Sequence, residues 1–328
     1  MPRQARLDAP GALHHIMVRG INKANIFADD EDKERFIERL GRNVEEGQCS
    51  VYAWAAMDNH AHVLFKSGKA GISAVMRKLL TWYAQYYNRR HKRTGHLFEN
   101  RYKSILCEED NYLIALVRYI HLNPVRAKIV KTIEELDSYP FSGHRTIIGK
   151  VKHPWMDVDY VLSQFGGTRR KGLAEYRRFM REGLGLGHRP ELSGGGLLRS
   201  LGGWSQVVAR RGSGEKEEGD ERILGSGDFV RAILKETEER QLRQLKLKLS
   251  GKNIQKIMDE ECKKEGISAA EVKNGVRRRA VSRLRAAIAS RGRTELGLSS
   301  AEMARSLGVA ASSISRLVEK MEGKGRTK

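Results

Sequence analysis

The order of strand and helix signals in the first 123 residues limits the folds open to this chain more than any other feature. Apolar runs bounded by glycine or turn residues predict strands at residues 13–20, 50–56, 60–66 and 102–107. Amphipathic patterns predict helices at residues 29–46, 71–93 and 109–123. This order predicts an α+β domain with a ferredoxin-like four-stranded antiparallel sheet and helices on one of its faces.

Composition divides the rest of the chain. We expect the α+β domain at residues 1–145, a helical extension at 146–182, and a flexible linker rich in Gly, Ser and charged residues at 183–226. Helical patterns resume at residue 227 and predict an all-α helix-turn-helix domain at 227–328.

The net charge indicates the kind of partner. The sequence has 61 Lys and Arg residues against 40 Asp and Glu residues, a formal net charge of +21. This balance favours a polyanion, either nucleic acid or an anionic membrane surface. No run of about 18 apolar residues and no N-terminal signal segment occurs, so we expect a cytoplasmic protein that does not span a membrane. Three scattered cysteines without a C-x-x-C pair fit reduced thiols and exclude a zinc finger or ribbon.

Two histidines, His60 and His62, lie two residues apart in the strand predicted at 60–66. Residues i and i+2 of a strand project from the same face, so the two imidazoles can share one metal ion. The alternative is a pair of polar residues at a strand edge. A metal held by these two side chains alone would be weakly bound and would need a third ligand.

The helix predicted at 109–123 offers both a third ligand and a nucleophile. Tyr119 and Asn123 are four residues apart, which places them one turn apart on one face of the helix. A phenol and an amide oxygen can then approach one point. A tyrosine on an amphipathic helix can equally belong to the core, and spacing alone does not separate these alternatives. Pro124 predicts a break or kink.

Four motifs follow one another in a characteristic order and spacing. They are LHHIMVRG at 13–20, MDNHAH at 57–62, GHLFENRYKS at 95–104 and RYIHLNPVRA at 118–127. Together they closely resemble the single-tyrosine HUH transposases, and specifically the REP-associated tyrosine transposase branch. The resemblance covers residues 10 to about 150, which is under half of the chain.

The resemblance implies a domain that cleaves and rejoins single-stranded DNA, often beside a hairpin. Tyr119 would be the nucleophile that forms a 5′-phosphotyrosine. His60 and His62 would be the HUH metal ligands, and Asn123 lies where relatives carry a Gln or Asn that completes the site. The metal would be Mg²⁺ or Mn²⁺. Ala61 departs from the family, which usually has a bulky apolar residue between the two histidines.

Arginines near these motifs are candidate phosphate contacts, namely Arg19, Arg101 and Arg126. For each of them a solvated surface charge is the alternative. His15 on the first strand can support the metal site from behind its ligands or fill the sheet face.

Residues 298–318 have the pattern of a helix-turn-helix motif, with Gly308 at the turn. A basic amphipathic helix precedes it at 276–285. The residues predicted to contact double-stranded DNA are Arg277, Arg278, Ser312, Ser313 and Arg316. The region from residue 229 resembles the C-terminal double-stranded-DNA domain of the bacterial replication initiator, but ASSI at 311–314 replaces that domain's His-Ser/Thr signature, so its site preference does not transfer. The alternative is a helical bundle with a basic surface.

The leading hypothesis is a transposase that acts on single-stranded DNA at its N-terminal domain and binds double-stranded DNA at its C-terminal domain, as a monomer or a homodimer. Two alternatives stay open. One is a regulator that binds DNA without catalysis, and the other is a metal-dependent nuclease in which water attacks.

Overall fold

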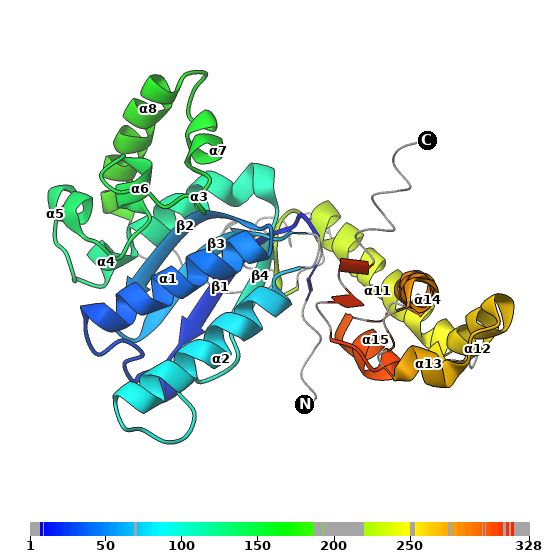
Figure 1. Ribbon diagram of the computed structural model, residues 1–328. Coiled ribbons are helices and arrows are strands. Elements are labelled where there is room, and N and C mark those ends of the chain that lie inside the picture. Colours follow the sequence, from blue (N-terminus) through cyan, green and yellow to red (C-terminus); the bar gives the residue numbers. More distant parts are fainter. Residues whose placement is uncertain are drawn as a thin grey trace. The chain divides into compact units, whose positions relative to one another are not determined.

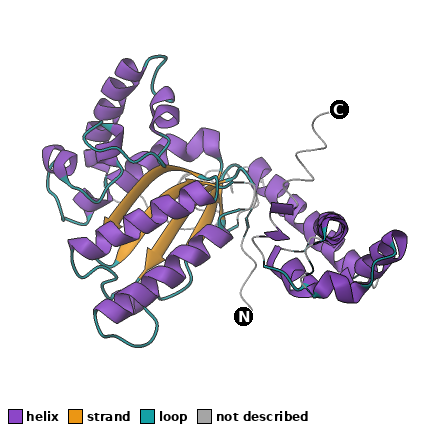
Figure 2. Ribbon diagram, viewed as in Figure 1, coloured by secondary structure: helices purple, strands orange, loops and turns teal. Residues whose placement is uncertain are grey.

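In the computed structural model, a five-stranded mixed sheet forms the centre of the first of two units, Met1–Ile233 (Figure 2). The strand order is β2-β3-β1-β4-β5, and β5 runs parallel to β4 while the other neighbours are antiparallel. The strands are β1 (Leu13–Arg19), β2 (Ser50–Met57), β3 (His60–Lys66), β4 (Lys103–Cys107) and β5 (Ile223–Leu224). The structure describes residues 7–8, 10–68, 71–186, 192, 220–249, 253–274, 276, 278–296, 298, 300–310, 313–314 and 316–317.

Three long helices pack on this sheet, and Figure 1 shows α1 (Asp30–Glu46) and α2 (Ser73–Arg90) side by side over one of its faces. The side chain of Asp29 caps α1 by accepting a hydrogen bond from Asp32 N, and the acidic first turn suits the helix dipole. α3 (Glu109–His121) lies on the other face, where the Glu109 carboxylate binds Lys66 Nζ at 2.9 Å. The expectation of helices on one face only is therefore wrong.

The burial of side chains along β3 shows that helices cover both faces of the sheet. His62 and Lys66 project from the face that α3 covers, whereas the alternate residues Val63 and Phe65 are 3% and 0% exposed on the opposite face. Both faces of the sheet are thus covered. Helix amphipathicity shows which side of a helix is buried but does not show which face of a sheet the helix occupies.

The expectation of a four-stranded, purely antiparallel sheet is also wrong, because β5 joins the edge next to β4. Leu106 N donates to Arg222 O and Glu108 N donates to Leu224 O, each at 2.8 Å. The Glu108 carboxylate also accepts a hydrogen bond from Ser226 N at 2.9 Å. The last residues of the linker predicted at 183–226 therefore belong to the sheet. The sequence did not predict this strand, because two residues are too few to show an alternating pattern of apolar and polar side chains. Residues 187–191 and 193–219 lie outside the described part of the chain.

Further helices belong to the first unit. They are η1 (Ile21–Lys23), α4 (Asn123–Arg126), α5 (Ile133–Ser138), α6 (His144–Ile147), α7 (Val158–Ser163), α8 (Arg169–Glu182) and η2 (Gly183–Leu186). Tyr176 of α8 is fully buried in the same apolar core as the sheet. Its hydroxyl lies 2.8 Å from Nδ1 of both His121 and His144, so buried hydrogen bonds join α8 to α3. A domain boundary at residue 145 stays a prediction.

In the second unit, Leu234–Lys328, the regular secondary structure that the described residues form is helical. Its helices are α11 (Gly227–Leu249, which begins in the first unit), α12 (Ile254–Glu265), α13 (Ala269–Lys273), α14 (Arg279–Leu296) and α15 (Ser300–Leu307). Apolar side chains of α12 to α15 and the buried Ile314 form one core. Within the described residues, neither unit contains a helix long and apolar enough to cross a membrane.

Gly308 ends α15 in a left-handed conformation with φ of +63°. A Cβ atom at this position would lie 1.9 Å from the carbonyl oxygen of Lys273. We expect Gly308→Ala to destabilise the second unit by at least about 2 kcal/mol, since the variant combines left-handed strain with a backbone clash. Thermal unfolding followed by circular dichroism measures the loss.

Gly266 provides the matched control for this variant. Its φ is +62°, but a Cβ atom there would meet nothing within 4 Å. Gly266→Ala should therefore cost only about 1 kcal/mol, the strain term alone. Equal losses for the two variants would show that the Lys273 carbonyl is not a rigid neighbour.

Candidate active site

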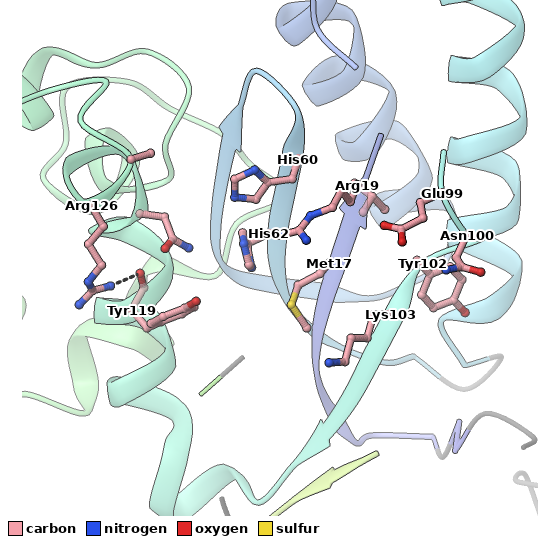
Figure 3. Close-up of a pocket in the computed structure, with 13 residues that line it drawn as sticks. Met17, Arg19, His60, His62, Glu99, Asn100, Tyr102, Lys103, Tyr119 and Arg126 are labelled. Carbon is pink, nitrogen blue, oxygen red and sulfur yellow. Dashed lines mark hydrogen bonds between the residues drawn. The ribbon is translucent and has the colours of Figure 1, made fainter. Parts of the chain in front are cut away.

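A pocket of about 500 Å³ opens where β1, β3 and β4 meet the end of α3 and the start of α4 (Figure 3). The side chains of all four residues predicted for catalysis and metal binding line it. The lining residues are Met17, Val18, Arg19, His60, His62, Glu99, Asn100, Tyr102, Lys103, Tyr119, Asn123, Arg126 and Ala127.

The pairing of β1 with β3 explains why the histidines gather. Met17 lies opposite His62 and Arg19 lies opposite His60 in an antiparallel register, so these side chains share one face of the sheet. The rings of His60 and His62 are 5.2 Å apart between centroids. The two-residue turn at Asp58 and Asn59 joins β2 to β3 and sets the register between these two strands, in which Met57 lies opposite His60.

His60 is held by a hydrogen bond from behind the pocket. Its Nδ1 lies 2.6 Å from Asn59 Oδ1, while Asn59 Nδ2 donates to Lys23 O at 3.1 Å. Because an amide oxygen only accepts, His60 Nδ1 donates and Nε2 keeps its lone pair. Burial, followed by the Arg19 charge, lowers the pKa of His60 to about 4. The ring is therefore neutral near pH 7, as a metal ligand requires.

His62 is more deeply buried, at 6% exposed, and its Nδ1 lies 2.9 Å from His15 Nε2. Burial, followed by the charges of His15 and His60, lowers the pKa of His62 well below its usual value. Its ring is also neutral near pH 7. Both predicted imidazole ligands thus have Nδ1 engaged in a hydrogen bond.

Tyr119 reaches the pocket from the last turn of α3 (Figure 3). Its ring meets the rings of His15 and His62 edge to face, at centroid distances of 5.9 and 6.0 Å. The Arg126 guanidinium lies 5.2 Å from the ring centroid of Tyr119 and donates to the Tyr119 carbonyl at 2.9 Å. These contacts hold the phenol beside the histidines, and the side chain is only 5% exposed.

Asn123 begins α4 directly after Leu122, and Pro124 follows within the first turn of α4. The break that Pro124 predicts is therefore present, yet Tyr119 and Asn123 still line one pocket. Asn123 is 9% exposed, and its Nδ2 has no hydrogen-bond partner among the described residues. Because no hydrogen bond from Nδ2 to another described residue fixes this buried amide, its oxygen can be turned toward a bound cation.

Two imidazoles and one amide oxygen form a sparse donor set. Nowhere in the described ranges are three His, Cys, Asp or Glu side chains grouped so that they can hold a metal ion. The set of His60, His62 and Asn123 nevertheless fits a divalent cation, because both rings are neutral and open positions remain for phosphate oxygens.

The predicted phosphate contacts are distributed unevenly. Arg19 and Arg126 line the pocket, whereas Arg101 lines an adjoining cavity of about 810 Å³ that shares Glu99, Asn100 and Tyr102 with it. Lys103 and Glu99 also line the pocket, and the sequence pattern suggested no role for either, although both lie within the motif at 95–104. Their only signal was their position in that motif.

The residues predicted to read double-stranded DNA are described in part. Arg278 forms an ion pair with Glu271, Ser313 is half-buried beside the buried Ile314, and Arg316 is exposed. Arg277 and Ser312 lie outside the described residues. Their roles stay predictions.

Comparison with known proteins bears on the first unit. Residues 10–123 match the family model described as transposase IS200 like. No curated protein matches the chain. A solved structure of a REP-associated tyrosine transposase bound to a REP hairpin aligns with 48% of this chain and 93% of its own, at 17% identity and a TM-score of 0.38. Over residues 10–123, this chain is therefore similar to the IS200-like transposase family.

Proposed function

We propose that the first unit cleaves and rejoins single-stranded DNA through Tyr119, with a divalent cation held by His60, His62 and Asn123. The observation that carries this proposal is the single pocket lined by all four side chains. The transposase family of residues 10–123 supports it.

In this mechanism the phenolic oxygen of Tyr119 attacks the phosphorus of the scissile phosphodiester. A bond from phosphorus to the tyrosine oxygen forms as the bond to the 3′ oxygen breaks, which leaves a 5′-phosphotyrosine and a free 3′-OH. The phenol proton passes to solvent and the departing 3′ oxygen takes one up. The phosphoester bond is conserved, so a 3′-OH can reverse the step and join strands without ATP.

The side chains around Tyr119 suit this chemistry. A bound divalent cation would neutralise charge on the non-bridging phosphate oxygens and on the departing oxygen. Arg126 orients Tyr119 through its carbonyl and ring, and Arg19 places a positive charge beside His60 in the same pocket. Both guanidinium groups can therefore attract the DNA backbone.

For the substrate we propose single-stranded DNA next to a hairpin, in line with the motifs of the REP-associated branch. For the second unit we propose double-stranded DNA binding by a helix-turn-helix. α15, the left-handed Gly308 and the helical residues 313–314 support this assignment. The net charge of +21 favours both partners.

Metal dependence tests the proposal. With a hairpin oligonucleotide, cleavage should require Mn²⁺ or Mg²⁺ and stop on addition of a chelator. We expect His60→Ala and His62→Ala each to lower the cleavage rate at least about 100-fold, because each removes a ligand and its share of charge stabilisation. Rates are measured on denaturing gels under single-turnover conditions.

His153 supplies the control. It is a partly buried histidine that packs against Trp54 and Trp155 and does not line the pocket. His153→Gln should cleave at the wild-type rate. Cleavage that survives both the chelator and the two alanine substitutions would contradict a metal role for His60 and His62.

A further inference from the structure

We propose that His15 is a positioning residue that fixes His62 in the tautomer with its proton on Nδ1, so that the Nε2 lone pair is available to the cation. This inference rests on the proposed function, because only that function gives the Nε2 lone pair of His62 a role, namely binding the cation. It concerns a side chain that is not among those lining the pocket.

The geometry at His15 leaves little freedom. His15 is fully buried, its Nε2 lies 2.9 Å from His62 Nδ1, and the two rings stack at 5.1 Å with an interplanar angle of 29°. The antiparallel register of β1 and β3 places both rings on the face that carries Tyr119. One proton must lie between the two nitrogens, and its owner decides the tautomer of His62.

The carbonyl of Leu192 decides which ring owns that proton. His15 Nδ1 lies 3.1 Å from Leu192 O, and a carbonyl only accepts, so His15 Nδ1 carries a hydrogen. His15 is fully buried, and the two hydrogen-bond partners of its ring, the Leu192 carbonyl and the His62 imidazole, are uncharged groups. A charged ring would be costly in this setting, so His15 is neutral and its Nε2 carries no hydrogen. His62 Nδ1 must then donate to His15, and the Nε2 of His62 is left as an acceptor.

The second ligand, His60, has the same tautomer for a different reason. Asn59 Oδ1 accepts from His60 Nδ1, which also leaves Nε2 unprotonated. The two ligands thus gain the same tautomer from different partners, a side-chain amide for His60 and a ring of β1 for His62. A proton on Nε2 of either ring would occupy the position that a cation needs.

The carbonyl that orients His15 belongs to Leu192, in a distant part of the chain. It is 177 residues from His15 and lies within the stretch predicted as a linker, yet it is 3% exposed. The carbonyl that orients His15 therefore comes from beyond residues 10–123, the segment that the family model matches.

The tautomer can be read directly in metal-free protein. Full-length protein labelled with ¹⁵N only in histidine, studied by long-range ¹H–¹⁵N correlation spectroscopy, distinguishes a protonated ring nitrogen from a bare one. The His62 signals are assigned by their loss in His62→Ala. We expect a protonated Nδ1 and a bare Nε2. A protonated Nε2 in the wild-type protein would overturn the proposal.

Metal affinity gives the second readout. Electron paramagnetic resonance of free Mn²⁺ in titrations without DNA should show about 10- to 100-fold weaker binding for His15→Leu. His15→Gln should restore affinity to within about threefold, because its Oε1 can accept the His62 proton. His14→Leu is the control, since His14 is equally buried but bonds Ser104 from the other face of β1.

Wild-type affinity in His15→Leu would contradict the proposal. If that variant does not fold, the wild-type tautomer still decides. Neither measurement uses DNA or cleavage. A protein that shows the expected tautomer and Mn²⁺ affinities but cuts no oligonucleotide would contradict the proposed function alone, and would leave the role of His15 intact.

Discussion

The Tyr119→Phe variant is expected to lose both DNA cleavage and the covalent protein–DNA adduct, with a fall in cleavage rate of at least about 10³-fold. Phenylalanine keeps the edge-to-face contacts with His15 and His62, and Arg126 still donates to the backbone carbonyl of residue 119. The fold and the metal site should therefore be unchanged, and only the attacking oxygen is removed.

The position of the label matters in this experiment. A 5′-phosphotyrosine holds the fragment on the 3′ side of the cut, so a 3′-labelled hairpin oligonucleotide should give a slowly migrating adduct on a denaturing gel. Tyr112→Phe is the control, since Tyr112 lies on the same helix but does not line the pocket. It should form the adduct like the wild type.

The other outcomes separate the alternative functions. If Tyr119→Phe still cuts and no adduct forms with either protein, water is the nucleophile and the protein is a metal-dependent nuclease. If the wild-type protein binds the oligonucleotide but neither cuts nor forms an adduct with Mn²⁺, the first unit serves DNA binding alone.

The first unit should lose stability steeply as the pH falls below about 6.5. The pKa of seven histidines is lowered, and burial is the main cause for each of them. The lowered pKa is about 4 for His14, His15 and His60. The other four are His62, His121, His144 and His153. A histidine with a lowered pKa in the folded state stabilises the fold above the pKa of the unfolded chain, and this contribution is lost as protons bind the unfolded chain.

The size of this effect follows from linkage. Each such histidine costs about 1.4 kcal/mol per pH unit between the unfolded pKa near 6.5 and the folded value. Three of them with a folded pKa of about 4 already remove roughly 4 kcal/mol per pH unit below pH 6. Typical domains have about 5–15 kcal/mol of stability, so we expect unfolding between about pH 6 and 4.

The second unit provides an internal control for the pH experiment. All ten histidines lie at or before His188, so residues 234–328 contain none. In thermal scans of the full chain at pH 7.5, 6.5, 5.5 and 4.5, the transition of the first unit should move to lower temperature first. Equal stability of the first unit at pH 7.5 and 5.5 would contradict the prediction.

The sequence predicted the local elements of the site well and their assembly only in part. The strands, the helix with Tyr119 and the break at Pro124 follow from periodicity and from proline chemistry, which act over a few residues. The face of the sheet that α3 occupies was wrongly predicted. A signal for two-sided burial was present, since β2 is an almost continuous apolar run in which every residue from Val51 to Met57 is buried.

Long-range partners were beyond reach of the sequence. The two apolar residues of β5 and the carbonyl of Leu192 lie in a stretch rich in Gly, Ser and charge, and a backbone carbonyl has no side-chain signature. The role of His15 depends on that carbonyl, which explains why the sequence left it open between packing and support of the metal site. The DNA-binding roles of Arg277, Arg278, Ser312, Ser313 and Arg316 still rest on sequence pattern alone.

The two outer strands of the sheet have a consequence for how copies of this protein can associate. β5 covers the outer edge of β4, and β2 is bridged at its outer edge by Ser142 and Met156. Exposed strand edges are the usual templates for joining sheets between chains. In the part of the chain that the structure describes, a second copy that pairs with β2 or β4 must displace one of these segments. Pairing of a second copy with β2 or β4 therefore carries the cost of breaking these backbone contacts first.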